Sequence, residues 1–403
     1  MPPYSPSRKN SRLKVPGFRA AGVSCGIKKT GKKDLALLLS DVPAITAGVF
    51  TTNKVKAAPV MLDIRRLKKG ISRGVIINSG NANACTGKDG YKDAERMASA
   101  VENLTGSGKG SVLVCSTGVI GVRLPVEKVE RGVPSLVNNL SYDGFSDASQ
   151  AVMTTDAFSK TAALSGRING KTVTVAGFAK GAGMISPNMA TMLAFIATDA
   201  RIWIGALRRS LRTAVDLTFN SIIVDNDTST NDTVLAFANG LSGCREIKTD
   251  SEAFKAFSAL LNGVCMKLAH MIVKDGEGAT RFIEINITGA VSTEQARRAA
   301  RTIAESFLVK TAFFGGDPNW GRIMAPLGRA GIRWKEGMTD IFFNGVQVVK
   351  DGCDAGNESK AAKAIKTKDV LVEVGLRAGR CSAKVWTTDL SFDYVRINSS
   401  YRT

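Results

Sequence analysis

The chain of 403 residues contains one histidine, His270, which excludes most catalytic sites that pair a serine or cysteine with a histidine base. Its seven cysteines are scattered and form no CxxC pair, which argues against a zinc site and for reduced thiols in the cytoplasm. No apolar run reaches the roughly 18 residues of a membrane-spanning helix. The hydrophobic content of 44% predicts a soluble globular protein with more than one structural unit.

Acidic residues are scarce beside basic ones, and the formal net charge is +20. Nucleic-acid binding is one hypothesis for this charge, and the protein would then be a basic binding protein without catalysis. Against it, the basic residues are dispersed, aromatic residues make up 6% of the chain, and no nucleic-acid-binding motif stands in the sequence. A positive field would also attract small anionic substrates, and we favour this second hypothesis.

The amino-terminal segment carries nine basic residues before the first acid, Asp34. It is acid-poor and contains serine, as transit peptides do, but it lacks the apolar core of a secretion signal. We interpret residues 1–33 as a short disordered basic arm.

The central stretch of the chain is residues 180–198, KGAGMISPNMATMLAFIAT. Its first half is turn-prone, and its second half is a short apolar run that predicts a buried strand over residues 192–197. Thr191 stands where they meet, a position that suits a nucleophile and equally the ordinary start of a strand. An amino-terminal threonine needs no histidine, because its own α-amine, with a reference pKa of roughly 7.7–8.0, takes the proton from its hydroxyl. Thr191 becomes amino-terminal only if the bond after Ala190 is cut.

Residues 180–193 closely resemble the self-cleaving centre of the ornithine acetyltransferases of arginine biosynthesis, also called bifunctional glutamate N-acetyltransferases. Other phrases typical of that family follow in the family's order: GFRAAG at 17–22, FTTN at 50–53, AAPV at 57–60, MTTDA at 153–157, FGGDPNWGR at 314–322 and YVRINSSYRT at 394–403. The resemblance therefore covers essentially the whole chain. It implies self-cleavage followed by ping-pong transfer of acetyl from N2-acetylornithine to glutamate through acetyl-Thr191.

The fold that the resemblance implies is α+β. It has a layered αββα core of the self-processing amino-terminal-nucleophile type over residues 1–287, cut between 190 and 191. A smaller carboxyl-terminal α+β domain over residues 288–403 sends its tail back to the active site. The resemblance also implies α and β chains from one precursor, assembled as an α2β2 heterotetramer without a membrane.

Local patterns agree with mixed α and β structure. Short strands are predicted over residues 35–39, 48–51, 74–78 and 111–115, and helices over 91–104, 203–219 and from Ser251 to just before His270. Hairpins are predicted at Asn169-Gly170 and Asn344-Gly345. Ser292 and Gln295 are spaced for a capping box. His270, at the end of its helix, is interpreted as a capping or packed residue.

Two polar loops are harder to interpret. Residues 79–84, SGNANA, either line a pocket or cap the helix that follows, and capping is favoured slightly. Residues 224–232, VDNDTSTND, lack the glycine and glutamate of a calcium loop. The family usually has glycine where this chain has Asn226, and asparagine also tolerates a positive φ. We interpret this second loop as structural support.

Thr117 and Gly118 follow a predicted strand and provide a hydroxyl and an unhindered backbone N–H. From the sequence alone a plain turn is the better interpretation, whereas the resemblance implies that they form the oxyanion hole. It also implies a set of substrate-binding residues: Thr154, Lys180, Thr191, Glu277, Asn398 and Thr403. Thr155 is an alternative to Thr154, and Glu277 could otherwise be a solvated turn acid.

No metal or cofactor is implied, and whether acetyl-CoA serves as a second acetyl donor stays open. The location implied is the cytoplasm, or the mitochondrial matrix if the source is eukaryotic. The alternative function is an aminopeptidase or amidase of the same amino-terminal-nucleophile fold, in which water replaces glutamate as the acceptor.

Overall fold

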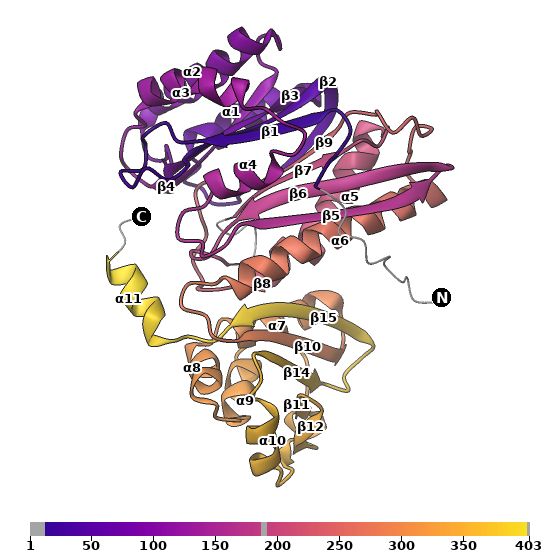
Figure 1. Cartoon of the computed structure of the whole chain (residues 1–403). Coiled ribbons are helices and arrows are strands. Elements are labelled where there is room, and N and C mark those ends of the chain that lie inside the picture. The colour runs from indigo at the N-terminus through magenta and orange to yellow at the C-terminus, as the bar shows by residue number, and fades with distance from the viewer. Residues whose placement is uncertain (1–12, 187–191, 401–403) are drawn as a thin grey trace.

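The computed structural model describes residues 13–186 and 192–400, so Ala190, Thr191 and Thr403 lie outside the described residues. Two sheets organise the chain into a larger unit and a smaller one (Figure 1). The larger sheet has the strand order β4-β3-β2-β9-β7-β6-β5, with β1 paired to β2. Its strands are β1 Phe18–Val23, β2 Leu35–Phe50, β3 Ile71–Asn81, β4 Val112–Val119, β5 Lys160–Ile168, β6 Lys171–Lys180, β7 Leu193–Thr198 and β9 Thr233–Ala238.

Strand β2 joins the two halves of this sheet. Its first part, residues 35–39, pairs with β1 and β3, and its last part, residues 45–50, pairs with β9. The prediction of two separate strands here was wrong. Pro43 lies between the two paired parts, where the register with β3 shifts, so it interrupts the hydrogen-bond ladder without ending the strand.

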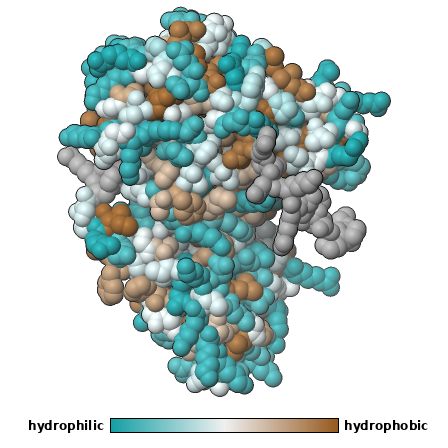
Figure 2. Space-filling model, in the orientation of Figure 1, coloured by the Kyte–Doolittle hydropathy of each residue, from teal (hydrophilic) through white to brown (hydrophobic). Residues whose placement is uncertain are grey.

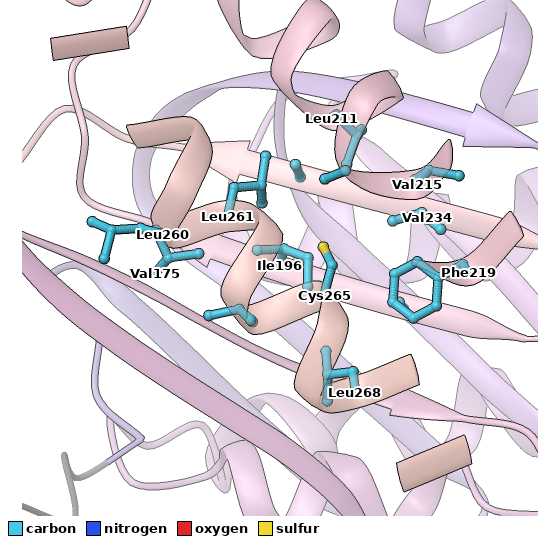
Figure 3. Close-up of a cluster of buried hydrophobic side chains, with 14 of the residues drawn as sticks. Val175, Ile196, Leu211, Val215, Phe219, Val234, Leu260, Leu261, Cys265 and Leu268 are labelled. Carbon is cyan, nitrogen blue, oxygen red and sulfur yellow. The ribbon is translucent and has the colours of Figure 1, made fainter. Parts of the chain in front are cut away.

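The sheet folds into two layers with a buried core between them. Strand residues alternate between faces, and the inner faces meet around aromatic side chains that include Phe178, Phe195 and Phe237. Helices cover the outer face of the β1–β4 layer: α1 Ala58–Arg66, α2 Gly87–Thr105 and α3 Val126–Asn138. The outer face of the other layer lies under α5 Ile204–Leu217 and α6 Glu252–Lys274, as Figure 3 shows for Leu211, Leu261 and Ile196. Helix α4, Phe145–Ala151, contributes Phe145 to the core between the layers. This order of layers confirms the predicted αββα core.

Helix α6 is longer than predicted. It begins at the predicted cap, where the Ser251 hydroxyl accepts from the N–H of Phe254 at 3.1 Å, but it runs on to Lys274. His270 therefore lies inside the helix, packed against the rings of Phe282 and Trp386 at 5.2 and 4.8 Å. Helix α6 is also long and apolar enough to cross a membrane, but its nine buried residues pack into the core, as expected of a central helix in a folded domain.

The smaller sheet has the order β13-β12-β11-β14-β10-β15-β8. Its strands are β8 Ile222–Ile223, β10 Phe282–Ala290, β11 Asp340–Phe343, β12 Val346–Lys350, β13 Cys353–Asp354, β14 Asp369–Gly375 and β15 Cys381–Thr388. Its helices are α7 Thr293–Ala304, α8 Phe307–Gly315, α9 Gly321–Gly328 and α10 Glu358–Ala364. Strand β10 belongs wholly to this sheet. The pairing of β8 with β15 ties the two units together.

Several local predictions are confirmed. Both predicted hairpins form, with positive φ at Asn169 and Asn344 and at the glycine after each. The Ser292 hydroxyl accepts from the N–H of Gln295 at 3.2 Å and caps α7. Asn226 has φ of 68°, as expected where relatives have glycine. The predicted disordered arm was wrong over part of its length, because residues 18–23 form β1 and pair with β2.

The last described element, α11 Phe392–Ser400, leaves the smaller unit and lies against the side of the molecule (yellow in Figure 1). The face drawn in Figure 2 is mostly hydrophilic, with separate apolar patches. Apolar side chains exposed on α8 and α11 include Phe307 (59%) and Phe392 (83%).

The core between the layers should carry much of the stability of the larger unit. Phe178 contacts the rings of Phe145 and Phe195 at 6.2 and 5.1 Å and is fully buried. Phe178→Ala should therefore lower the free energy of unfolding by about 3–5 kcal/mol, through lost burial and the cavity left behind. The midpoint of urea unfolding measures this. Val55→Ala, at an exposed site outside α8 and α11, is the control and should change stability by less than about 0.5 kcal/mol. Equal midpoints for the two variants would contradict this role for the core.

Candidate active site

One pocket, with a volume of about 190 Å³, lies where the ends of β4 and β6 meet the loop before β10 and helix α11. Six of the predicted site residues line it: Thr117, Gly118, Thr154, Lys180, Glu277 and Asn398. Thr155, the alternative to Thr154, lines it too. The structure thus brings together residues from positions 117 to 398 of the chain. Met192, the first described residue after the predicted cleavage site, is buried and leads into β7.

Lys180 and Thr117 are in direct contact at the base of the pocket. The Lys180 ammonium donates to the Thr117 hydroxyl oxygen at 3.3 Å, and both residues are buried. An ammonium group has no lone pair to accept with. The Thr117 oxygen must therefore accept in this contact, which leaves its own O–H free to donate elsewhere. Such a donor is what an oxyanion hole requires.

Gly118 is fixed by its surroundings. Its φ is +131°, a backbone conformation that residues with a side chain rarely adopt. A Cβ at this position would lie 2.3 Å from the carbonyl carbon of Gly80, so no side chain fits. Only glycine therefore places a backbone N–H here, next to the Thr117 hydroxyl.

Buried charges lie behind Lys180. The Asp156 carboxylate accepts from the Lys160 ammonium at 2.7 Å and from the N–H of Gly181 at 2.8 Å. Lys160 also bonds the Asp275 carboxylate. Burial raises the pKa of Asp156, but the charges of Lys180 and Lys160 outweigh burial and hold that pKa at about 2. Asp156 is therefore an anion at neutral pH and stabilises the charge of Lys180.

The pKa of Lys180 itself is lowered from its ordinary value. Burial lowers the pKa of Lys180, and the charge of Lys160 lowers it further. The carboxylates of Asp156, Glu277 and Asp232 oppose that decrease, Asp156 most strongly. The ammonium thus depends on neighbouring anions, and a bound carboxylate would add another.

The loop 224–232 holds both ends of the segment that contains the predicted cleavage site. The Asp225 carboxylate accepts from the N–H groups of Met184 and Ile185 at 2.6 and 2.7 Å. On the far side, the Asp232 carboxylate accepts from the N–H of Met192 at 3.0 Å. Both carboxylates are buried, and burial raises the pKa of each, that of Asp225 to about 6. The interpretation of this loop as structural support was therefore incomplete, because Asp225, Asp227 and Asn231 also line the pocket.

Asn231 joins the loop to the opposite wall. Its buried amide donates to the carbonyl oxygens of Ala82 and Ser116 at 2.7 and 2.8 Å. Ser116 precedes the predicted oxyanion-hole residues, so this amide positions them relative to the loop. Ala82 lines the pocket, whereas the neighbouring Asn83 bonds Thr86 and Gly90 at the start of α2. Residues 79–84 thus have both of the roles that the sequence left open: they line a pocket, and they bond the start of the helix that follows.

The outer wall of the pocket comes from the loop before β10 and from α11. The Asn398 amide donates to the Glu277 carboxylate at 2.9 Å, and the Tyr394 hydroxyl donates to the Asp225 carboxylate at 3.3 Å. A Cβ at Gly183 would lie 2.4 Å from the Glu277 carboxylate, so the glycine lets this acid approach. Glu277 is therefore a wall of the pocket and not merely a solvated turn acid.

Sequence reasoning missed Asp156, Asp225, Asn231 and Tyr394 as parts of the site. The available signal was the density of polar residues in 224–232 at the end of an apolar strand, together with the acid inside MTTDA. Within the described residues, 13–186 and 192–400, no three or more side chains that could bind a metal lie close together.

Comparisons with known proteins agree with the resemblance in the sequence. The model of the ArgJ family matches residues 19–403. The arginine biosynthesis bifunctional protein ArgJ of Geobacter sulfurreducens is 50% identical over 393 residues, which cover 97% of this chain and all of that protein. Its counterpart from Symbiobacterium thermophilum is 48% identical over 390 residues, covering 96% of this chain and 97% of that protein.

A solved structure of the ArgJ protein from Bacillus halodurans superposes with a TM-score of 0.51 at 39% identity. That likeness covers 52% of this chain and the whole of the solved chain. Matches of this length and identity settle the family: the chain belongs to the ArgJ family.

Proposed function

We propose that this protein is a self-processed glutamate N-acetyltransferase of arginine biosynthesis that transfers acetyl from N2-acetylornithine to glutamate. The observation that carries the proposal is a pocket that gathers Thr117, Gly118, Lys180, Glu277 and Asn398. Membership of the ArgJ family and the names of the relatives support the same reaction.

The charges of the pocket suit the donor. N2-acetylornithine carries a carboxylate and a side-chain ammonium. The buried Lys180 ammonium provides the cation for the carboxylate, and Glu277 and Asp227 provide anions for the ammonium at the more open side. For glutamate, the second carboxylate needs donors there, and it would have to take over the Asn398 amide from Glu277 and the Tyr394 hydroxyl from Asp225.

The chemistry follows from the free hydroxyl proton on Thr117. Thr191 attacks the acetyl carbonyl, and its α-amine accepts the hydroxyl proton. The Thr117 O–H and the Gly118 N–H stabilise the oxyanion, a contribution of about 2.7–4 kcal/mol for one such donor. Ornithine leaves with that proton, and the glutamate amine then attacks the ester on Thr191. Exchange through an ester splits one difficult amide transfer into two steps.

Cleavage between Ala190 and Thr191 is part of this proposal. The described contacts that support it hold the residues on either side: Asp225 fixes Met184 and Ile185, and Asp232 fixes Met192. In addition, the solved Bacillus halodurans chain corresponds to 52% of this one. The 213-residue product expected here is about 53% of the chain, so that share matches one of two cleavage products.

The assembly that we propose is α2β2. Apolar side chains on α8 and α11 remain exposed, among them Leu308, Val395 and Phe392, whose ring stacks edge-on against Phe314 at 5.5 Å. A second copy of the chain would cover such a surface. The native mass should then be twice 42.7 kDa.

Thr191 should act first in cleavage and then in transfer. The purified protein should consist of fragments of 190 and 213 residues, the second beginning at Thr191. Thr191→Ala should remain one chain of 42.7 kDa without transferase activity, because alanine has no nucleophile. Thr191→Ser should cleave at least in part. Intact-mass measurement of the three proteins shows which of them are cleaved. A wild-type protein that is active without cleavage would contradict the mechanism. Acetate release without glutamate would favour the amidase alternative.

Removing the Asp156 charge should change the pH dependence of transfer. Lys180 binds the carboxylate only when protonated, so activity falls as pH rises through its pKa. Asp156 is the main group that raises this pKa, and Asp156→Asn should therefore move the alkaline limb of kcat/KM to lower pH. Lys180→Met has no charge at this position, so the alkaline limb of kcat/KM should disappear. KM should rise for both substrates. An alkaline limb at the wild-type pH in Asp156→Asn would contradict this coupling.

The carboxyl-terminal tail should serve binding and not cleavage. Deleting residues 398–403 removes the amide that bonds Glu277, so fragments should still form while KM rises about tenfold, as expected from losing a charge-assisted hydrogen bond. Arg396→Ala, on the same helix, is the control, because its ion pair within residues 13–186 and 192–400 is with the neighbouring Asp393. Full transfer activity in the truncated protein would rule out a role for the tail.

A further inference from the structure

Lys310, on helix α8, is fully buried, and the proposed reaction gives it no role. Its ammonium donates to the backbone carbonyl oxygen of Thr388 at 2.8 Å and to the hydroxyl oxygen of the same residue at 3.2 Å. Within residues 13–186 and 192–400, no carboxylate lies close enough to Lys310 to form an ion pair. A buried ammonium is costly unless hydrogen bonds and nearby charges compensate for its lost hydration. The bonds to Thr388 are therefore the direct contacts that hold this charge in place.

Thr388 is the last residue of β15, and residues 389–391 connect that strand to helix α11. Helix α8 holds this connection at a second point, because the carbonyl oxygen of Lys310 accepts from the N–H of Leu390 at 3.3 Å. Helix α11 supplies part of the outer wall of the active-site pocket. Lys310 therefore fixes the start of the segment that forms this wall.

The residue after Thr388 holds the loop that carries Glu277. The Asp389 carboxylate accepts from the N–H groups of Thr280 and Arg281 at 2.8 and 3.0 Å. Asp389 is buried, so these donors satisfy a group that would otherwise be costly to bury. The connection therefore fixes the end of the loop from which Glu277 reaches the pocket.

Two close packing contacts hold the rest of that loop. A Cβ at Gly276 would lie 2.8 Å from the methyl group of Thr388, and a Cβ at Gly278 would lie 2.4 Å from the backbone nitrogen of Tyr394 in α11. The two glycines therefore let β15 and α11 approach the chain on both sides of Glu277. Both parts of the outer wall, the loop and the helix, thus depend on the chain that Lys310 anchors.

The charge of Lys310 lies within electrostatic reach of the active-site loop 224–232. Burial lowers the pKa of Lys310 to about 7, and the negative charges of Asp225 and Asp389 oppose this decrease. Asp225 lines the pocket, and Asp389 fixes the loop before β10. The anions that stabilise the buried ammonium therefore belong to the pocket and to its support.

We infer that Lys310 is a positioning residue for substrate recognition, which acts by fixing Thr388 and thereby the placement of Glu277 and α11 at the outer side of the pocket. This inference rests on the proposed acetyltransferase function, in which that side binds the side-chain ammonium of acetylornithine and the second carboxylate of glutamate. Lys310 touches neither the substrates nor the reacting atoms. Removing its ammonium should therefore weaken substrate binding without changing the chemistry at Thr117 and Gly118.

The kinetic test uses the cleaved protein and the exchange between N2-acetylornithine and glutamate. Lys310→Met keeps a side chain of similar length and removes the donors, so KM for both substrates should rise about tenfold while kcat and cleavage stay unchanged. Lys360→Met makes the same substitution at an exposed position of α10 and is the matched control, with KM as in the wild type. Thr388→Val removes only the longer of the two bonds. Its KM should rise about threefold, and it replaces Lys310→Met if that variant does not fold.

A double-mutant cycle separates positioning from general stability. Asn398→Ala removes the amide that bonds Glu277 in the same wall. Since both changes would disturb one binding surface, KM of Lys310→Met/Asn398→Ala should match that of the more affected single variant. KM increases that multiply, or an unchanged KM in Lys310→Met and Thr388→Val whatever their stability, would overturn the inference. Ornithine binding in calorimetry gives the same comparison without turnover, so a wild type that binds ornithine but does not exchange acetyl would count against the proposed function alone.

Discussion

The carboxylates of Asp225 and Asp232 provide the constraint on which the site depends. Each is buried, and each accepts hydrogen bonds from backbone N–H groups near the predicted cleavage site, while Asp225 also accepts from the Tyr394 hydroxyl. A buried carboxylate is costly unless such donors satisfy it, so the loop and the segment stabilise each other's conformation. Both acids come from one short loop, and the eight residues from 225 to 232 therefore fix the spacing of the two ends. A nucleophile generated by cleavage needs this anchoring, because a new chain end would otherwise fray.

The layered core explains how that loop reaches the site. Strands β7 and β9 are parallel neighbours, with Leu193 opposite Thr233, so the residues that precede each strand lie side by side. Asp232 and Met192 are those residues. Strand β2 then pairs with β3 and β3 with β4 in the second layer, and Thr117 and Gly118 lie near the end of β4. The strand that follows the predicted nucleophile and the strand of the predicted oxyanion hole thus belong to one sheet, and β2 joins the two halves of that sheet.

The sequence predicted much of this arrangement because several features are local. Asparagine-glycine pairs, capping residues and short apolar runs specify their own structure, and the hairpin at Asn169 and the cap at Ser292 formed as expected. The family resemblance supplied the site residues. Features that depend on distant partners were not predictable: the continuity of β2 across Pro43 requires β9, and the burial of Asp225 requires Tyr394, 169 residues away. His270 was placed outside its helix because nothing local marks the five further residues of α6, 270–274.

The role of the basic residues also depends on where each of them lies in the fold. A net charge of +20 spread over a surface steers anions in general, but the placement of single lysines determines chemistry. Lys160 and Lys180 are buried, and their charges are compensated by Asp156 and Asp275, so they act inside the site. Lysines of the β1–β2 loop lie one backbone layer away and are only partly compensated. Charge in this protein therefore increases from a balanced centre towards a less balanced rim, an arrangement that attracts small anions towards the pocket.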